Sequence, residues 1–147
     1  MPAVFVDQIT VLDCACLTEE RGLIGESWIV DVSLSGQLNQ DDMVIDFGLM
    51  KSLIKQTLDE AMDHRLLVPS KSPNVRINPD GDQISVRMEL SDETHLVYQA
   101  PTQAVCLLPC EKIDAEVVCE TAKNAIARVV PANSTQVEVS LRVDGHE

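Results

Sequence analysis

An aspartate followed directly by a histidine, Asp63-His64, consists of the residue types best suited to move a proton. An imidazole changes its charge near neutral pH, and a carboxylate beside it can orient the ring. Neighbouring residues of a helix point in different directions, so the two can cooperate only where the helix has ended. A structural alternative stays open, in which His64 stabilises a helix C-terminus through the macrodipole and Asp63 binds nearby backbone or Arg65.

Cysteines are the second group that could do chemistry, and five of them are present, at positions 14, 16, 106, 110 and 119. An odd number without a secretory signal favours reduced thiols over a disulfide framework. Neither Cys14-Ala15-Cys16 nor the pair Cys106 and Cys110 shows the CxxC pattern of a structural zinc site. We expect the thiols to serve mainly as small buried hydrophobic groups.

Apolar spacing predicts the elements that must position these residues. Alternation predicts strands over residues 3–12, with a bulge at Asp7-Gln8, and over 27–35, where Trp28, Val30, Val32 and Leu34 share one side. After a turn at 36–42, Asp46 is expected to cap a helix that ends near residues 64–67. The buried stripe predicted for this helix comprises Phe47, Met50, Ile54, Leu58 and Ala61.

The second half predicts further strands, one helix and a final strand. Residues 73–109 form an extended strand region with turn signals at 79–82 and 91–93, and its role is not assigned. Asp114 is expected to cap a helix whose buried stripe is Val118, Ala122, Ile126 and Val129 and which Pro131 ends, and residues 135–143 alternate as a strand. Together they predict one α+β domain over residues 1–147, with both helices on one face of an antiparallel sheet.

Composition restricts the classes of partner. Eleven Lys and Arg stand against 24 Asp and Glu, and a net charge of -13 repels nucleic acid and anionic membrane surfaces. No apolar run approaches the ~20 residues that span a bilayer, and the N-terminus lacks the features of a signal peptide. We therefore expect a cytoplasmic protein with no nucleic-acid or membrane partner.

The stretch from Leu23 to His64 resembles the family of 6-pyruvoyl-tetrahydropterin synthase and its bacterial relative, 6-carboxytetrahydropterin synthase. The likeness lies in the order and spacing of a strand beginning LIGESW, a polar turn QLNQDD, a helix opened by Ile45-Asp46-Phe47-Gly48, and Asp63-His64. The resemblance implies the tunnelling fold (T-fold), in which subunits join their sheets into a barrel and active sites lie between subunits. It also implies a homo-oligomer, a trimer or a hexamer.

The histidines that hold the family's catalytic zinc are replaced in this chain. The family's Leu-His-Gly-His-Asn-Tyr segment corresponds to Leu23–Trp28, so Ile24 and Glu26 stand at two zinc positions. The third corresponds to Ala15 or Cys16, depending on the alignment gap. Because Ile and Ala carry no donor atom for a cation, we predict no metal-binding residues and no cofactor.

Two other family features are altered. The loop that carries the family's catalytic cysteine corresponds to residues 17–22, which contain none, so Cys14 or Cys16 would have to serve as a displaced acid. The glutamate that anchors the pterin ring corresponds to Leu141. Leaving the polar edge of the ring without partners would cost on the order of 1–3 kcal/mol.

These differences lead to three hypotheses. The first is a divergent family member that lacks the zinc-dependent reaction and binds a small pterin-like or other molecule at a subunit junction, where Glu26 and Glu116 are expected. Glu116 has an equally good structural interpretation near a helix N-terminus. The second is an active synthase or lyase acting on dihydroneopterin triphosphate or a related pterin, with His64 as proton shuttle and Asp63 as its orienting carboxylate. The third is an acidic structural subunit that binds a partner protein.

Overall fold

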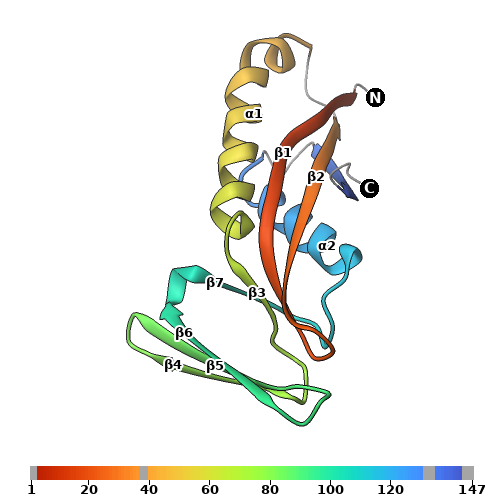
Figure 1. Ribbon diagram of the computed structural model, residues 1–147. Coiled ribbons are helices and arrows are strands. Elements are labelled where there is room, and N and C mark those ends of the chain that lie inside the picture. Colours follow the sequence, from red (N-terminus) through yellow and green to blue (C-terminus); the bar gives the residue numbers. More distant parts are fainter. Residues whose placement is uncertain (1–2, 37–39, 131–134, 144–147) are drawn as a thin grey trace. The chain divides into compact units, whose positions relative to one another are not determined.

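The computed structural model describes residues 3–36, 40–130 and 135–143, and of residues 40–47 and 135 it describes only the backbone (Figure 1). The elements in chain order are β1 (Ala3–Thr18), β2 (Gly22–Gly36), α1 (Gln40–Met62), β3 (Leu66–Pro69), β4 (Val75–Asp80), β5 (Gln83–Glu89), β6 (His95–Pro101), a short 3₁₀ helix (Thr102–Ala104), β7 (Val105–Leu108), α2 (Ala115–Ala127) and β8 (Thr135–Val143).

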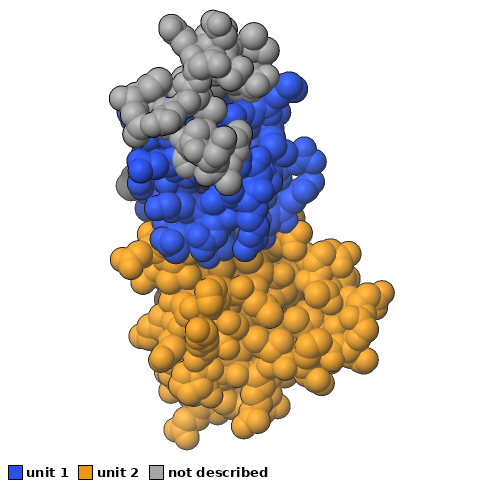
Figure 2. All heavy atoms as spheres, turned by 180° about the vertical axis from the view of Figure 1, so that it is seen from behind, with its two compact units in different colours: residues 1–12, 27–63, 119–147 blue, residues 13–26, 64–118 orange. Residues whose placement is uncertain are grey.

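The chain divides into two compact units, coloured separately in Figure 2. Unit 1 comprises Met1–Leu12, Ser27–Asp63 and Cys119–Glu147, and unit 2 comprises Asp13–Glu26 and His64–Val118. In the described ranges, no helix combines the length and the apolar character that crossing a membrane requires.

The predicted alternation is confirmed over residues 30–35 of β2, whereas Ile29 is buried although it lies on the opposite side from Trp28 and Val30. Trp28, Val30, Val32 and Leu34 are all buried, and the irregularity expected at Asp7-Gln8 is present in β1. Gln8 has a φ of 53°, and its backbone N–H donates a hydrogen bond of 2.7 Å to Asp31 Oδ1. Residues of L configuration rarely adopt positive φ, so this contact helps to hold the bulge in place.

The five-stranded sheet has the order β7-β3-β1-β2-β8 and is mixed, not wholly antiparallel as predicted. β3 pairs in parallel with both β1 and β7, whereas β8 pairs antiparallel with β2. The apolar pattern predicts a helix end near residues 64–67, but residues 66–69 form the strand β3. All four residues of β3 are buried, so the strand shows no alternation by which a period of two could be recognised.

Helix α1 begins at Gln40, and the prediction that Asp46 caps it is therefore wrong. Residues 40–45 contain neither Gly nor Pro, so the helix extends through them. The predicted stripe is confirmed at Ile54 and Leu58, which are 1% and 0% exposed, and α1 and α2 lie alongside β1 and β2 in unit 1 (Figure 1). The side chain of Phe47 lies outside the described residues.

Helix α2 begins where the sequence predicts. The backbone N–H of Val117 donates a hydrogen bond of 2.9 Å to Asp114 Oδ1, which is the geometry of an N-cap. Val118, Ala122 and Ile126 are fully buried, as expected. The last predicted stripe residue was Val129, but its neighbour Val130 is the buried one, because the helix ends at Ala127.

We expect Asp114→Ala to lower the free energy of unfolding by about 1 kcal/mol, because it leaves an N–H group of the first turn without its acceptor. Urea denaturation followed by circular dichroism measures the loss. Glu120→Ala, an exposed substitution within the same helix, is the matched control and should change stability by less than about 0.5 kcal/mol. Equal losses in the two variants would show that the cap contributes nothing specific.

The extended strand region forms an antiparallel sheet in unit 2, with the order β4-β5-β6. β5 alternates strictly, and Ile84, Val86 and Met88 are buried while the residues between them are not. These three side chains share a core with Leu17, Leu66, Val68 and Val105. The region whose role was unassigned therefore supplies much of the core of unit 2.

Candidate functional site

The Asp63-His64 pair follows the end of α1, so the condition for cooperation between the two side chains is met. The N–H of Asp63 donates a hydrogen bond of 3.0 Å to the carbonyl of Asp59, and His64 lies in the turn beyond it. His64 is exposed, Asp63 is half-buried, and the φ of His64 is 108°. Such a backbone conformation costs on the order of 1–3 kcal/mol in a residue other than glycine and is enriched at functional sites.

Within unit 2, parallel pairing places the second part of β1, residues 13–18, beside the residues that follow His64. The backbone N–H of Ala15 donates a hydrogen bond of 3.1 Å to the carbonyl of Arg65. In the register, Ala15 lies opposite Leu66 and Cys16 opposite Leu67. Ala15 and Cys16, the two candidates for the third zinc position, both lie in β1. The pairing of β1 with the segment after α1 thus begins at Arg65, one residue after His64.

Cys14, Cys16 and Glu26 come together within unit 2. Cys14 is 7% exposed and Cys16 is 2% exposed, so the expectation of buried thiols is confirmed for these two, whereas Cys106, Cys110 and Cys119 are half-buried. Burial, followed by the proximity of Cys14 and of the Glu26 carboxylate, raises the pKa of Cys16 to about 12. A thiol with this pKa stays protonated at neutral pH, so Cys16 is poorly suited as a nucleophile.

The side chains at the family's zinc position do not fit a zinc ion. Ile24 offers no donor atom, Glu26 offers one carboxylate, and the third position is held by Ala15, which has no donor atom, or by the buried Cys16. Within the part of the chain that the structure describes, no three His, Cys, Asp or Glu side chains are grouped so that they could hold a metal ion.

Two other positions from the sequence comparison lie in α2 and β8. Glu116 is exposed in the first turn of α2, where its charge favours the helix dipole. Leu141, at the family's anchor position, is half-buried and lies opposite the buried Val30 in the register. Glu138 is exposed three residues earlier, and its Oε1 lies 3.9 Å from Lys123 Nζ.

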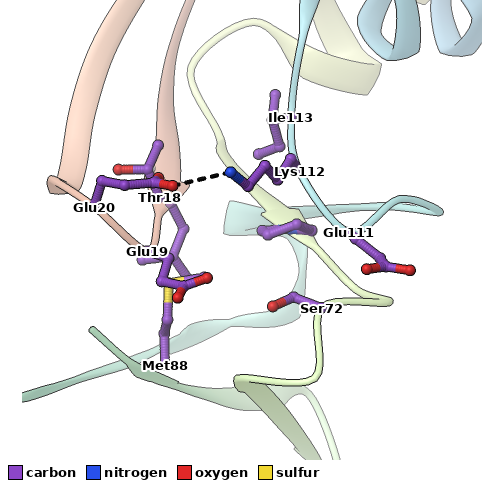
Figure 3. Close-up of a pocket in the computed structure, with 10 residues that line it drawn as sticks. Thr18, Glu19, Glu20, Ser72, Met88, Glu111, Lys112 and Ile113 are labelled. Carbon is purple, nitrogen blue, oxygen red and sulfur yellow. Dashed lines mark hydrogen bonds and ion pairs between the residues drawn. The ribbon is translucent and has the colours of Figure 1, made fainter. Parts of the chain in front are cut away.

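A cavity of about 70 Å³ in unit 2 was not predicted (Figure 3). Its lining comes from the β1–β2 hairpin, β3, β5 and the segment before α2, and consists of Leu17, Thr18, Glu19, Glu20, Pro69, Ser72, Met88, Glu111, Lys112 and Ile113. Lys112 Nζ and Glu20 Oε2 form an ion pair of 3.0 Å that joins the hairpin to residues 111–113. The hydrogen bond from Lys112 lowers the pKa of Glu20 and raises that of Lys112.

The tight β1–β2 hairpin fixes the position of the glutamates in this cavity. The hydroxyl of Thr18 donates a hydrogen bond of 3.1 Å to the carbonyl of Gly22 and accepts one of 3.1 Å from the N–H of Arg21. Gly22 has a φ of 71°, which glycine adopts without strain. In the sequence, the acidic pair Glu19-Glu20 could have indicated this cavity. The family resemblance predicts only that residues 17–22 correspond to the catalytic loop.

A second hollow, of about 280 Å³, lies in unit 1 and is open to solvent. It is lined by Phe5, Asp7, Asp31, Val32, Ser33, Glu138 and Ser140. Arg142 donates hydrogen bonds of 2.7 and 3.0 Å to the two carboxylate oxygens of Asp31. That bidentate contact lowers the pKa of Asp31.

The fold and the strand region after α1 define an α+β protein whose architecture is that of the tetrahydropterin synthases. The profile of the family described as 6-pyruvoyl tetrahydropterin synthase matches residues 18–143, and the chain belongs to this family. A Methanocaldococcus jannaschii protein provisionally assigned as a 6-carboxy-5,6,7,8-tetrahydropterin synthase is 30% identical over 122 residues, which cover 80% of this chain and 71% of the relative.

Solved structures of the family share the fold. The crystal structure of 6-pyruvoyl tetrahydropterin synthase from Plasmodium vivax superposes with a TM-score of 0.68 over 97% of this chain and 98% of that chain, at 18% identity. The Plasmodium falciparum protein gives a TM-score of 0.67 at 17% identity and the same coverage. The expectation of the T-fold is therefore confirmed.

Proposed function

We propose that this protein is a divergent member of the family that does not carry out the zinc-dependent reaction at the inherited position. In place of that reaction it binds a small pterin-like or other molecule at a junction between the subunits of a homo-oligomer, a trimer or a hexamer. The observation that supports this best is the replacement of the family's zinc histidines by Ile24, by Glu26 and by Ala15 or the buried Cys16. Leu141 at the anchor position supports it further, because a leucine side chain cannot accept hydrogen bonds from a pterin ring.

Metal analysis of protein purified without chelators tests the proposal. We expect far less than one zinc per chain. The variant Cys16→His/Ile24→His/Glu26→His restores three imidazoles. It should retain about one zinc ion per chain, since three protein ligands suffice for a catalytic zinc site. About one tightly held zinc in the unaltered protein would contradict the proposal.

The alternative of an active synthase or lyase is favoured by one specific observation, the retained Asp63-His64 pair with the positive φ of His64. The chain would be incubated with dihydroneopterin triphosphate and zinc, and the products separated by chromatography. If the alternative holds, His64→Ala abolishes turnover while His95→Ala, an exposed histidine of β6, leaves it unchanged. Absence of turnover together with unchanged pterin fluorescence on mixing would leave the alternative without support.

A further inference from the structure

Strand β6 forms one edge of the three-stranded sheet in unit 2. The order of this sheet is β4-β5-β6, so within the described residues β6 has a neighbouring strand on one side only. Val97 is 50% exposed, and His95 and Gln99 on the same face are exposed as well. On the opposite face Tyr98 is half-buried, whereas its partner in β5, Val86, is fully buried. Both faces thus become more open to solvent toward β6.

Two hydrogen bonds at the ends of β6 show which backbone groups point outward. The N–H of Leu90 donates a hydrogen bond of 2.8 Å to the carbonyl of Thr94, and the N–H of Thr102 donates one of 2.9 Å to the carbonyl of Asp82. Hydrogen-bonded positions alternate along an antiparallel pair, so the even-numbered residues of β6 bond to β5. The odd-numbered residues direct their N–H and C=O groups away from β5, and they are His95, Val97, Gln99 and Pro101, of which Pro101 has no N–H.

The other edge of the sheet, β4, is protected where β6 is not. Pro79 of β4 has no N–H, and the N–H of Val75 already donates a hydrogen bond of 3.2 Å to the carbonyl of Ser72. Natural sheets block their edges with proline, with charged side chains or with bulges, because an open edge pairs with other strands. Residues 95–100 of β6 contain no proline and no Asp, Glu, Lys or Arg.

A second copy of β6 fits this edge. The net charge of -13 opposes the approach of two copies in general, but β6 carries no charged side chain. Antiparallel pairing about a two-fold axis at Val97 places Val97 opposite itself and His95 opposite Gln99. Every outward N–H and C=O of these residues then has a partner in the other copy. On the other face Leu96 lies opposite Tyr98, so both half-buried side chains gain an apolar neighbour.

The residues at the two ends of β6 favour this register over its neighbours. A shift of two residues would bring either Glu93 or Pro101 opposite an outward residue. The N–H of Glu93 already donates a hydrogen bond of 3.1 Å to the carbonyl of Leu90, and Pro101 has no N–H. Only the arrangement centred on Val97 lets all three outward residues exchange both of their hydrogen bonds.

We propose that β6 pairs antiparallel with β6 of a second copy about a two-fold axis at Val97, so that two three-stranded sheets become one continuous sheet. Such a contact uses the same surface of both copies and therefore gives a particle with an even number of chains. The inference goes beyond the proposed function and does not rest on it, because β6 contains none of the altered zinc or anchor positions.

The variant Val97→Lys tests the contact, because it places two ammonium groups opposite one another at the axis and removes no buried side chain. Light scattering after size-exclusion chromatography should give an even number of chains for the unaltered protein and half that mass for the variant. Gln83→Lys adds the same charge to the exposed face of the interior strand β5 and should leave the mass unchanged. A monomer or an odd number of chains in the unaltered protein, or an undiminished mass in Val97→Lys, would overturn the proposal.

Hydrogen exchange of the unaltered protein, measured by NMR, tests the contact without a variant. The N–H groups of His95, Val97 and Gln99 should exchange slower by a factor of about ten or more than that of Ile77, which points away from β5 at the β4 edge. Equally fast exchange at the two edges would overturn the proposal even if the particle were even-numbered. Neither readout depends on zinc content, so this proposal and the proposed function fail separately.

Discussion

Replacement of Leu58 by alanine should lower the free energy of unfolding by about 2–5 kcal/mol. Leu58 lies in the stripe of α1 that faces the interior of unit 1, and its side chain is 0% exposed. Truncation removes buried methyl groups from the core and leaves a cavity that neighbours fill only partly. Urea denaturation followed by circular dichroism and by Trp28 fluorescence measures the change.

The same substitution at Leu53 is the matched control, because Leu53 lies on the same helix and is 42% exposed. We expect Leu53→Ala to cost less than about 1 kcal/mol, since surface truncations away from special contacts have small effects. Comparable losses at the two positions would mean that α1 does not bury the face on which Ile54 and Leu58 lie.

Strands that bury one face could be predicted from the sequence, and strands that bury both faces could not. β2 was recognised because Val30 and Val32 alternate with the half-buried Asp31 and Ser33. β3 was missed because its four buried residues follow a helix directly and have the composition of a continued helical stripe. The parallel pairing of β3 with β1 and β7, which turns the sheet into a mixed one, is a tertiary contact that local periodicity does not encode.

Local contacts within the candidate site were predictable, and contacts between distant segments were not. The cap of α2 by Asp114 follows from residues three positions apart, and the structure confirms it. The approach of Glu26 to Cys16 depends on how the β1–β2 hairpin closes. The cavity depends on four separate segments, residues 17–20, 69–72, 88 and 111–113. Nothing in the spacing of these residues indicates that they meet.

The stability of the protein should fall steeply above pH 9 because of Cys16. Its pKa is raised from 9.0 to about 12 in the folded state, chiefly by burial. The unfolded chain therefore releases this proton first. The contribution of the protonated Cys16 thiol to the free energy of unfolding is fully present below pH 9. It decreases by about 1.4 kcal/mol for each further pH unit and is lost by about pH 12, a total of roughly 4 kcal/mol.

Urea denaturation of the wild type and of Cys16→Ala, at intervals from pH 8 to pH 11, measures this effect. Cys16→Ala removes the titrating group, so its free energy of unfolding should decline less with pH, and the two curves should converge as pH rises. Val68→Ala is the control, because it truncates a fully buried residue of the neighbouring strand without removing a titrating group. It should lower stability by a similar amount at every pH and keep the slope of the wild type. If Cys16→Ala kept that slope as well, the thiol would ionise equally in both states, and Cys16 would again be available as a thiolate ligand or a catalytic acid.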